Sequence, residues 1–178
     1  LGDLLMWDRG MRGMALLNVL IAVSIIGGIL SVALPAALSL YARAAVEYEA
    51  MHLIGELRRV QAISRMTAMP LDMFQGRRSW ERMPSIRIHP DHYVLRRPFG
   101  SDLRIYNMLP LVRLRQETME NTLVAFDWNG NVSGNWSHNM TIRVYVMGYE
   151  EDALCVVIDK AARIRLQRGE ADAVDEES

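Results

Sequence analysis

The part of the chain that decides its fold is the stretch GMALLNVLIAVSIIGGILSVALPAALSLYA, which covers residues 13–42 and contains no charged side chain. As an α-helix, the stretch from Met14 onward is roughly 40 Å long, because a helix rises about 1.5 Å per residue. A helix needs about 20 predominantly apolar residues to cross a bilayer. The sequence therefore predicts a membrane-spanning helix over about residues 14–42.

Positive charge lies on the amino-terminal side of this stretch, at Arg9 and Arg12. Basic residues that flank a span are retained in the cytoplasm. An ordinary secretory signal would have a shorter apolar core followed by a small-residue cleavage site. We therefore expect a single-pass protein in contact with the lipid of the inner (cytoplasmic) membrane, with its C-terminal head outside the cytoplasm.

The helical pattern continues beyond Ala42, but only one face of the helix is apolar. Glu49 and Glu56 are among the charged residues that fall mostly off that face, whereas small or apolar residues recur on it at spacings of three and four, namely Val46, Ala50, Leu53, Leu57, Val60 and Ser64. Such a stripe requires a partner surface. Pro70 ends the helix near Ala68, because its ring removes a hydrogen-bond donor and clashes with the preceding turn.

After Pro70 the sequence consists of short apolar segments separated by turn residues, which predicts an antiparallel sheet or a small sandwich. The expected strands are Ile86–Ile88, Tyr93–Leu95, Leu103–Tyr106, Leu111–Leu114, Leu123–Phe126, Thr141–Val146, Leu154–Ile158 and Ala162–Leu166. The fold class is therefore α+β, with a long helix over 14–68 packed on a β-rich head over 69–169. The acidic tail at 170–178 has one large hydrophobic residue, and we expect it to be disordered.

The order of residues around Gly13 is specific. Gly13 precedes an apolar run that starts at Met14, has the polar Asn18 in fifth place and has Pro35 as the twenty-second residue after Gly13. This order resembles the prepilin processing motif of the type IV pilin and pseudopilin family. The resemblance implies a leader at 1–13, cleavage between Gly13 and Met14 by a prepilin peptidase, and methylation of the new amino group. It also implies a pilin-like fold and assembly with other pilins or pseudopilins in a filament, with Asn18 and Pro35 at assembly positions.

Two residues depart from the family pattern. The family usually has phenylalanine and glutamate where this chain has Met14 and Asn18. In the family, that glutamate pairs with the amino terminus of a neighbouring subunit inside the apolar filament core. Asn18 can form hydrogen bonds but cannot neutralise a charge. We therefore expect this chain to be a minor or tip subunit.

Parts of the head resemble a narrower group, the H-type minor pseudopilins, the FimT-like minor pilins and the competence pseudopilins. The similar segments are GELRRVQAISR at 55–65, VAFDWNG at 124–130 and CVVIDKAARIRL at 155–166, although the group usually has a glycine in place of Ala162. The resemblance implies a minor subunit of a type II secretion pseudopilus or a type IV pilus-like filament. Two alternatives are a DNA-binding minor pilin of a competence system and an anchored domain that never enters a filament.

Charge is distributed unevenly along the head. The segment Ala50–Arg115 carries 12 arginines and 5 acidic residues, whereas Gln116–Ser178 carries 5 basic and 12 acidic residues. Aromatic residues accompany the arginines that are candidates for DNA binding, namely Arg77, Arg78, Arg82, Arg96 and Arg97. Basic and aromatic side chains together are typical of nucleic-acid grooves, through phosphate contacts and stacking. The alternatives are a solvated face, or a patch that meets the acidic half of a neighbouring subunit.

The sequence contains no pattern typical of an enzyme. A glycine-rich phosphate loop and a serine nucleophile elbow are both missing from it. His89 and His92 share one turn with Asp91, but a proline intervenes and no further ligand follows at regular spacing, so we expect no metal site. We expect neither catalytic residues nor a cofactor. The single cysteine, Cys155, lies in an apolar run and is expected to be buried.

Overall fold

The computed structural model describes residues 2–67, 83–98, 101–117, 123–132, 140–159 and 161–169, with the backbone alone for 2–13. Compact units are formed by Leu1–Tyr41 and by Ala42–Ser178. Arg77, Arg78, Arg82 and the tail 170–178 lie outside the described residues.

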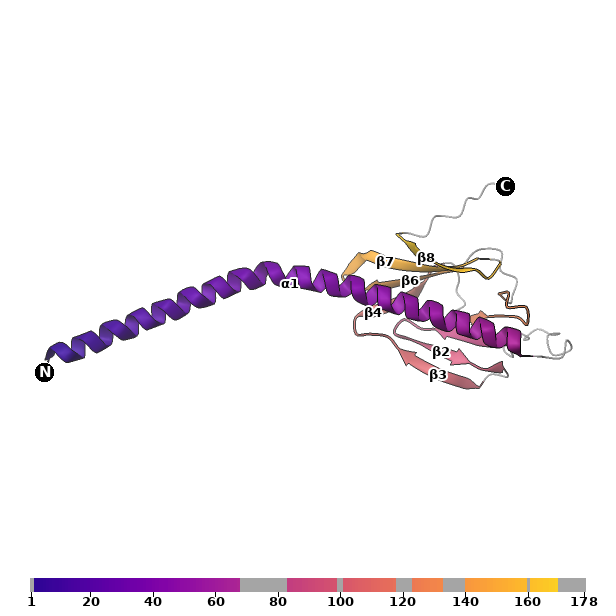
Figure 1. Cartoon of the computed structure of the whole chain (residues 1–178), viewed down its shortest axis with the longest axis horizontal. Helices are drawn as coiled ribbons and strands as arrows, with labels where there is room; N and C mark the ends of the chain where they lie inside the picture. The colour runs from indigo at the N-terminus through magenta and orange to yellow at the C-terminus, as the bar shows by residue number, and fades with distance from the viewer. Residues whose placement is uncertain are drawn as a thin grey trace. The chain divides into compact units, whose positions relative to one another are not determined.

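The helix α1 spans Gly2–Met66 (Figure 1). It therefore begins within the segment expected to be the leader and ends two residues before the expected position. Pro35 lies inside it, where the ring removes one intrahelical hydrogen bond. At its C-terminal end, the Thr67 amide donates to the carbonyls of Ile63 and Ser64 at 3.0 and 3.3 Å.

The head contains two four-stranded antiparallel sheets. Sheet A has the order β3-β2-β1-β5 and consists of β1 (Ser85–Ile88), β2 (His92–Arg96), β3 (Asp102–Asn107) and β5 (Leu123–Ala125). Sheet B has the order β4-β6-β7-β8 and consists of β4 (Val112–Gln116), β6 (Met140–Val146), β7 (Tyr149–Ile158) and β8 (Ile164–Arg168). Each expected strand is confirmed, and β7 starts five residues earlier than expected.

The chain changes sheet three times between β3 and β6. Strand β4 pairs with β6, whereas β5 returns to sheet A and pairs with β1 through Ser85 opposite Ala125 and Ile86 opposite Val124. Consecutive strands therefore do not simply form one meander.

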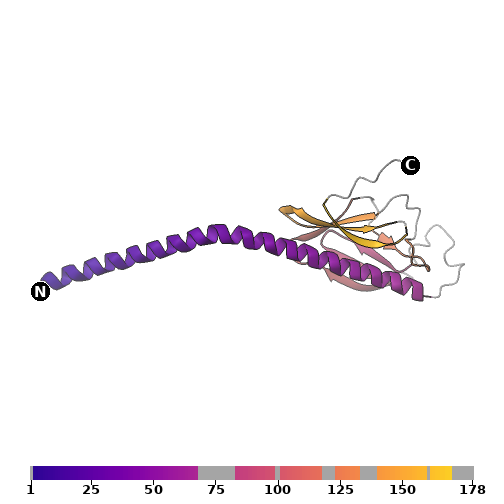
Figure 2. The same cartoon turned by 45° about the horizontal axis from the view of Figure 1, so that its top comes forward.

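From Ala42 onward, α1 runs beside both sheets, as the two views in Figures 1 and 2 agree. The apolar core lies between α1 and the two sheets. Every second residue of the strands enters it, as Ile142 and Val144 of β6 and Ile86 of β1 illustrate. Helix and sheets bury one continuous apolar cluster, which is the α+β arrangement predicted from the sequence. Cys155 is buried as expected, and its thiol donates to the carbonyl of Gly169 at 3.3 Å.

Candidate assembly helix and the face of the head that it covers

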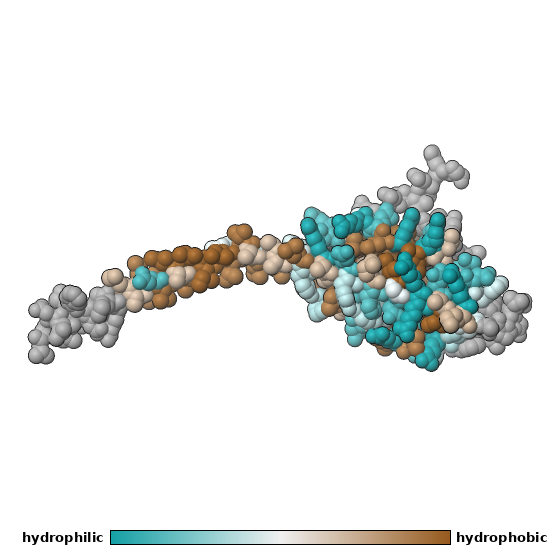
Figure 3. All heavy atoms as spheres, in the orientation of Figure 1, coloured by the Kyte–Doolittle hydropathy of each residue, from teal (hydrophilic) through white to brown (hydrophobic). Residues whose placement is uncertain are grey.

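The uncharged part of α1 exposes nearly all of its apolar side chains. Met14 is 69 % exposed, Val32 75 % and Leu40 65 %, and Figure 3 shows apolar residues along this segment. By length and composition, α1 is a helix that could cross a membrane. An apolar surface of this extent requires a cover of lipid or of other helices.

Most polar side chains in the uncharged stretch bond to the helix itself. The hydroxyls of Ser24, Ser31 and Ser39 donate to backbone carbonyls three or four residues earlier, at 2.8, 2.8 and 2.9 Å. This satisfies them without water. Asn18 is exposed, and among the described residues its amide makes no hydrogen bond. Its hydrogen-bonding groups therefore face outward from the helix.

The predicted stripe on the second half of α1 is confirmed. All six of its residues are buried, and Val46, Ala50, Leu53 and Leu57 are each 0 % exposed. Ser64 ends the stripe: its hydroxyl donates to the carbonyl of Phe126 at 2.9 Å and also contacts that of Asp127. The last turn of α1 is thereby fixed to the end of β5.

Two glutamates that the sequence places mostly off the apolar stripe, Glu49 and Glu56, are nevertheless buried. Glu49 is 0 % exposed, and its Oε1 accepts a hydrogen bond from the Leu109 amide at 2.7 Å. Glu56 is 8 % exposed and lies 3.6 Å from Arg59 and 4.0 Å from Arg104. Buried charges require such partners. Arg59 is on α1 itself, whereas Arg104 of β3 and the Leu109 amide come from the head, and periodicity within α1 cannot reveal those two.

An aromatic cluster lies next to these glutamates, between α1 and sheet A. The rings of His52 and Tyr106 stack with centroids 4.1 Å apart, and Nδ1 of His52 lies 2.5 Å from the Tyr93 hydroxyl. Burial raises the pKa of both Tyr93 and Tyr106. The carboxylates of Glu56 and Glu49 raise the pKa of Tyr93 further, and that of Glu49 raises the pKa of Tyr106. Both hydroxyls therefore remain protonated and available as donors.

The turn after β5 is held to α1 by side chains of the helix. Asp127 Oδ1 accepts hydrogen bonds from the amides of Asn129 and Asn131 at 2.9 and 2.8 Å. Gln61 then donates to the carbonyl of Gly130 at 2.8 Å, and Gly130 has a φ of +77°. This positive φ favours glycine, and a Cβ at this position would also contact the flexible side chain of Arg65. The segment 124–130 is thus part of the helix–head contact.

The turn between β7 and β8 meets the same glutamine. Gln61 also donates to the carbonyl of Ala162 at 3.1 Å. Asp159 stabilises the turn by accepting from the amide of Arg163 at 2.9 Å and pairing with its guanidinium at 2.6 Å. Ala162 has a φ of +57°, which is the left-handed region that favours glycine. Ala162 thus adopts a backbone conformation that would suit the glycine expected here from the sequence resemblance.

The arginines predicted to bind DNA are only partly placed. Arg96 pairs with Asp102 across β2 and β3 at 3.3 Å, whereas Arg97 is exposed. The Arg77, Arg78 and Arg82 group lies outside the described residues. The expectation that these five arginines bind DNA therefore stays a prediction.

Sequence reasoning missed a second set of arginines, on the face of sheet B that points away from α1. The register places Arg115 directly opposite Arg143, with Arg113 opposite Tyr145, and Arg165 lies on the same face of β8. Arg143 also pairs with Glu117 at 3.3 Å. The signal was the alternation of arginine with apolar residues at 113–115 and 163–165, which is a strand pattern with a charged outer face.

Among the described residues, no three His, Cys, Asp or Glu side chains are placed to hold a metal ion. The rings of His89 and His92 stack with centroids 4.3 Å apart, and Nδ1 of His92 lies 2.7 Å from Asp91. The hydrogen bond from His92 lowers the pKa of Asp91. The three residues of this turn thus interact mainly with one another.

No protein-family model matches the chain, and no curated protein matches it in sequence. Two crystal structures of the type IV minor pilin FimU from Pseudomonas aeruginosa are similar to it. The structure in space group P21 has a TM-score of 0.52 at 15 % identity and covers 70 % of this chain and 90 % of that one. The structure in space group P65 has a TM-score of 0.49 at 15 % identity, covering 68 % and 91 %. The chain thus has the fold of a type IV minor pilin, with one long N-terminal helix on antiparallel sheets.

Proposed function

We propose that the chain is a non-enzymatic, membrane-anchored subunit of a type IV pilin-like filament. Residues 14–42 hold it in the inner membrane before assembly and pack against the same segment of other pilins or pseudopilins afterwards. The observation that carries this proposal is the uncharged, exposed surface of α1, in a chain that has the fold of a minor pilin. The same surface suits both environments, since each covers apolar side chains without requiring charges.

We further propose that it is a minor subunit of a type II secretion pseudopilus or a type IV pilus-like filament, placed at or near the tip. Asn18 supports this, because an amide offers hydrogen bonds but no negative charge to a neighbouring amino terminus. A buried charge without a countercharge costs several kcal/mol. A subunit at the tip has fewer neighbouring subunits, so fewer amino-terminal charges lie next to Asn18 without a countercharge.

Processing between Gly13 and Met14 tests the premise of the proposal. The full chain is expressed with and without a prepilin peptidase, and the mass of its amino-terminal peptide is measured. We expect loss of residues 1–13, a methylated Met14, and the shortened chain in the sheared filament fraction. Gly13→Phe should stay at precursor length, whereas the control Gly10→Phe should still be cut. A Gly13→Phe variant that is shortened at the same bond would contradict the prepilin assignment.

A second candidate function is DNA binding by a minor pilin of a competence system, and the outer face of sheet B favours it. Arg115 lies directly opposite Arg143, and like charges at opposed positions destabilise a strand pair. Glu117 offsets part of this repulsion. A phosphate backbone that runs over Arg113, Arg115 and Arg165 would offset the rest.

The test compares two arginine sets in the full chain in detergent, by DNA retardation at increasing salt. We expect weak binding that falls steeply with salt, because phosphate contacts release counterions. If sheet B binds DNA, then replacing Arg113, Arg115 and Arg165 together with Gln should abolish retardation. Loss of retardation only when Arg77, Arg78 and Arg82 are replaced would assign binding to that group instead. An unretarded wild-type chain at low salt would remove this candidate.

A further inference from the structure

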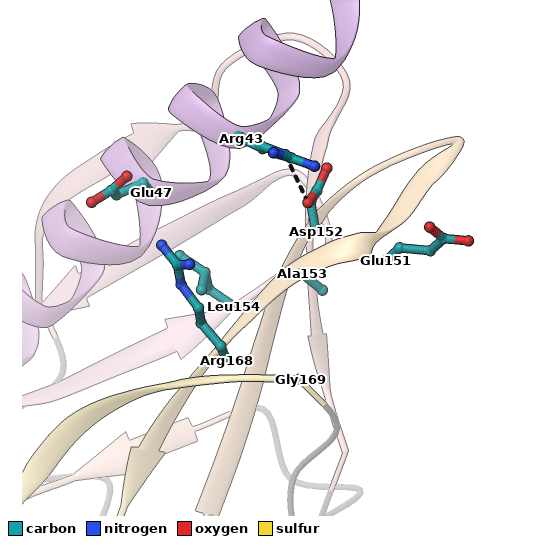
Figure 4. Close-up of a pocket in the computed structure, with 8 residues that line it drawn as sticks. All are labelled: Arg43, Glu47, Glu151, Asp152, Ala153, Leu154, Arg168 and Gly169. Atoms are coloured by element: carbon teal, nitrogen blue, oxygen red, sulfur yellow. Dashed lines mark hydrogen bonds and ion pairs between the residues drawn. The ribbon is translucent and has the colours of Figure 1, made fainter.

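A charged cavity of about 390 Å³ lies where α1 first meets the head (Figure 4). Arg43 and Glu47 line it from successive turns of α1, Asp152 lines it from β7, and Arg168 projects from β8 toward the helix. Its volume is within the range of small-molecule sites, roughly 300–1,000 Å³. We call this cavity the Arg43 pocket.

The charges of the Arg43 pocket are only partly neutralised by one another. Arg43 pairs with Asp152 at 2.9 Å. Among the described residues, by contrast, the guanidinium of Arg168 and the carboxylate of Glu47 form neither an ion pair nor a hydrogen bond. Glu151 also lines the cavity, and its carboxylate likewise has no ion pair or hydrogen bond among the described residues. One unpaired cation and two unpaired anions therefore line the same cavity, which fits a ligand that carries both signs.

The position of the pocket along the chain indicates where such a ligand is found. Arg43 directly follows Ala42, the last residue of the uncharged stretch. If that stretch spans the bilayer, as the proposed function requires, the pocket lies at the level of the lipid headgroups. Lipid headgroups that contain a phosphate and an ammonium carry both a negative and a positive charge, and they lie at the membrane surface.

We propose that the Arg43 pocket binds a phosphate ester that carries a primary ammonium, as in the phosphoethanolamine headgroup. The guanidinium of Arg168 donates paired hydrogen bonds to the phosphate, for which its planar fork is suited. The carboxylate of Glu47 accepts hydrogen bonds from the ammonium, which has three N–H donors. A choline headgroup has no N–H donors on its nitrogen, so the pocket should discriminate against it.

Apolar side chains at the same end of the head support a lipid as the source of this group. Arg43 contacts Asp152 near the start of β7, whereas Gln61 contacts Ala162 beyond its end, so the turn before β7 lies on the Arg43 side. In that turn Met147 is 55 % exposed, and its amide donates to Leu111, which is also 55 % exposed. These two exposed apolar side chains lie at the same end of the head as the pocket.

The experiment measures lipid retention by the full chain in detergent, using native mass spectrometry. The chain is offered phosphatidylethanolamine, phosphatidylcholine, or soluble phosphoethanolamine as a competitor. We expect retention of phosphatidylethanolamine over phosphatidylcholine. Arg168→Gln and Glu47→Gln should each lower that retention about tenfold, the scale of one charge-assisted contact. Arg58→Gln, an exposed arginine of α1 that does not line the pocket, should leave it unchanged.

Each outcome decides one point. Competition by soluble phosphoethanolamine at concentrations equal to those of the lipid would assign the group to a soluble metabolite, whereas its failure to compete assigns it to the membrane lipid. Equal retention of both lipids, unchanged in Arg168→Gln, would overturn the proposal. A chain that does not sediment with membranes at all would instead overturn the proposed anchor, so the two failures are distinguishable.

Discussion

Ala162 has a backbone conformation that ordinarily selects glycine, with a φ of +57°. Its carbonyl accepts a hydrogen bond from Gln61, and its amide donates to the carbonyl of Asp159 at 2.8 Å. These contacts hold the residue in place. The strain of an L-residue in this region, about 1–2 kcal/mol, is therefore carried by the native turn.

Ala162→Gly should raise the free energy of unfolding by on the order of 0.5–1 kcal/mol. The strain is removed, and the greater entropy of glycine in the unfolded chain offsets part of the gain. Denaturant unfolding of the full chain in detergent measures the change. Ala153→Gly is the matched control: Ala153 is buried in β7, so the same substitution there should be destabilising. A loss of stability in both variants would contradict the prediction.

Asp159 makes the stability of this turn sensitive to acid. Burial acts to raise its pKa, but hydrogen bonds from the amide and guanidinium of Arg163 outweigh it, and the pKa lies below its ordinary value. A carboxyl with a lowered folded pKa stabilises the protein above its unfolded pKa of about 3.9, and the stabilisation is lost as pH falls through the folded pKa. Asp159→Asn should therefore be less stable than wild type at neutral pH, and the difference should shrink below about pH 4. Thermal unfolding across this range tests it, and a difference that is constant with pH would contradict it.

At the scale of elements, α1 carries two different surfaces in succession. Before residue 42 its apolar side chains are exposed, and after it a stripe of buried residues packs on both sheets. The stripe is flanked by Glu49 and Glu56, whose burial costs free energy that hydrogen bonds and ion pairs must offset. The helix is therefore fixed to the head by a narrow apolar seam with a polar border.

The seam should account for the attachment of α1 to the head. Leu53 is 0 % exposed, and Leu53→Ala should lower the free energy of unfolding by about 2–5 kcal/mol, because it leaves a cavity between helix and sheets. Met51 is 57 % exposed on the same helix, and Met51→Ala should change it by no more than about 0.5 kcal/mol. Equal effects of the two substitutions on denaturant unfolding would show that the seam is not the stabilising contact.

At the scale of the whole molecule, the proposed place of the subunit in a filament depends on one residue of the uncharged stretch. Asn18 is exposed on α1, with an amide that makes no hydrogen bond among the described residues. We expect Asn18→Glu to increase the proportion of this chain in purified filaments, since a carboxylate would neutralise a neighbouring amino terminus. Asn18→Gln is the control, with a similar size and no charge. Quantitative mass spectrometry of sheared filaments gives the ratio. A wild-type chain that is already the most abundant subunit would defeat the argument.

The sequence by itself determined the features that depend on neighbours along the chain. Each local pattern predicts which face of a regular element meets apolar surroundings. These patterns are a run without charges, a stripe with spacings of three and four, and strands of alternating polarity. This is why the six stripe residues and all eight strands could be predicted. The strand ends differed where residues such as Tyr149 and Glu150 extended β7 toward the turn at 147–148.

Only the tertiary structure decided which distant segments meet. The return of β5 to β1 joins Ala125 to Ser85, and the burial of Glu49 depends on a donor at Leu109. The opposition of Arg115 and Arg143 is likewise a property of strand register. Such contacts join residues that are 28 to 60 positions apart. No local period encodes them, because each is selected by the packing of the complete head on α1.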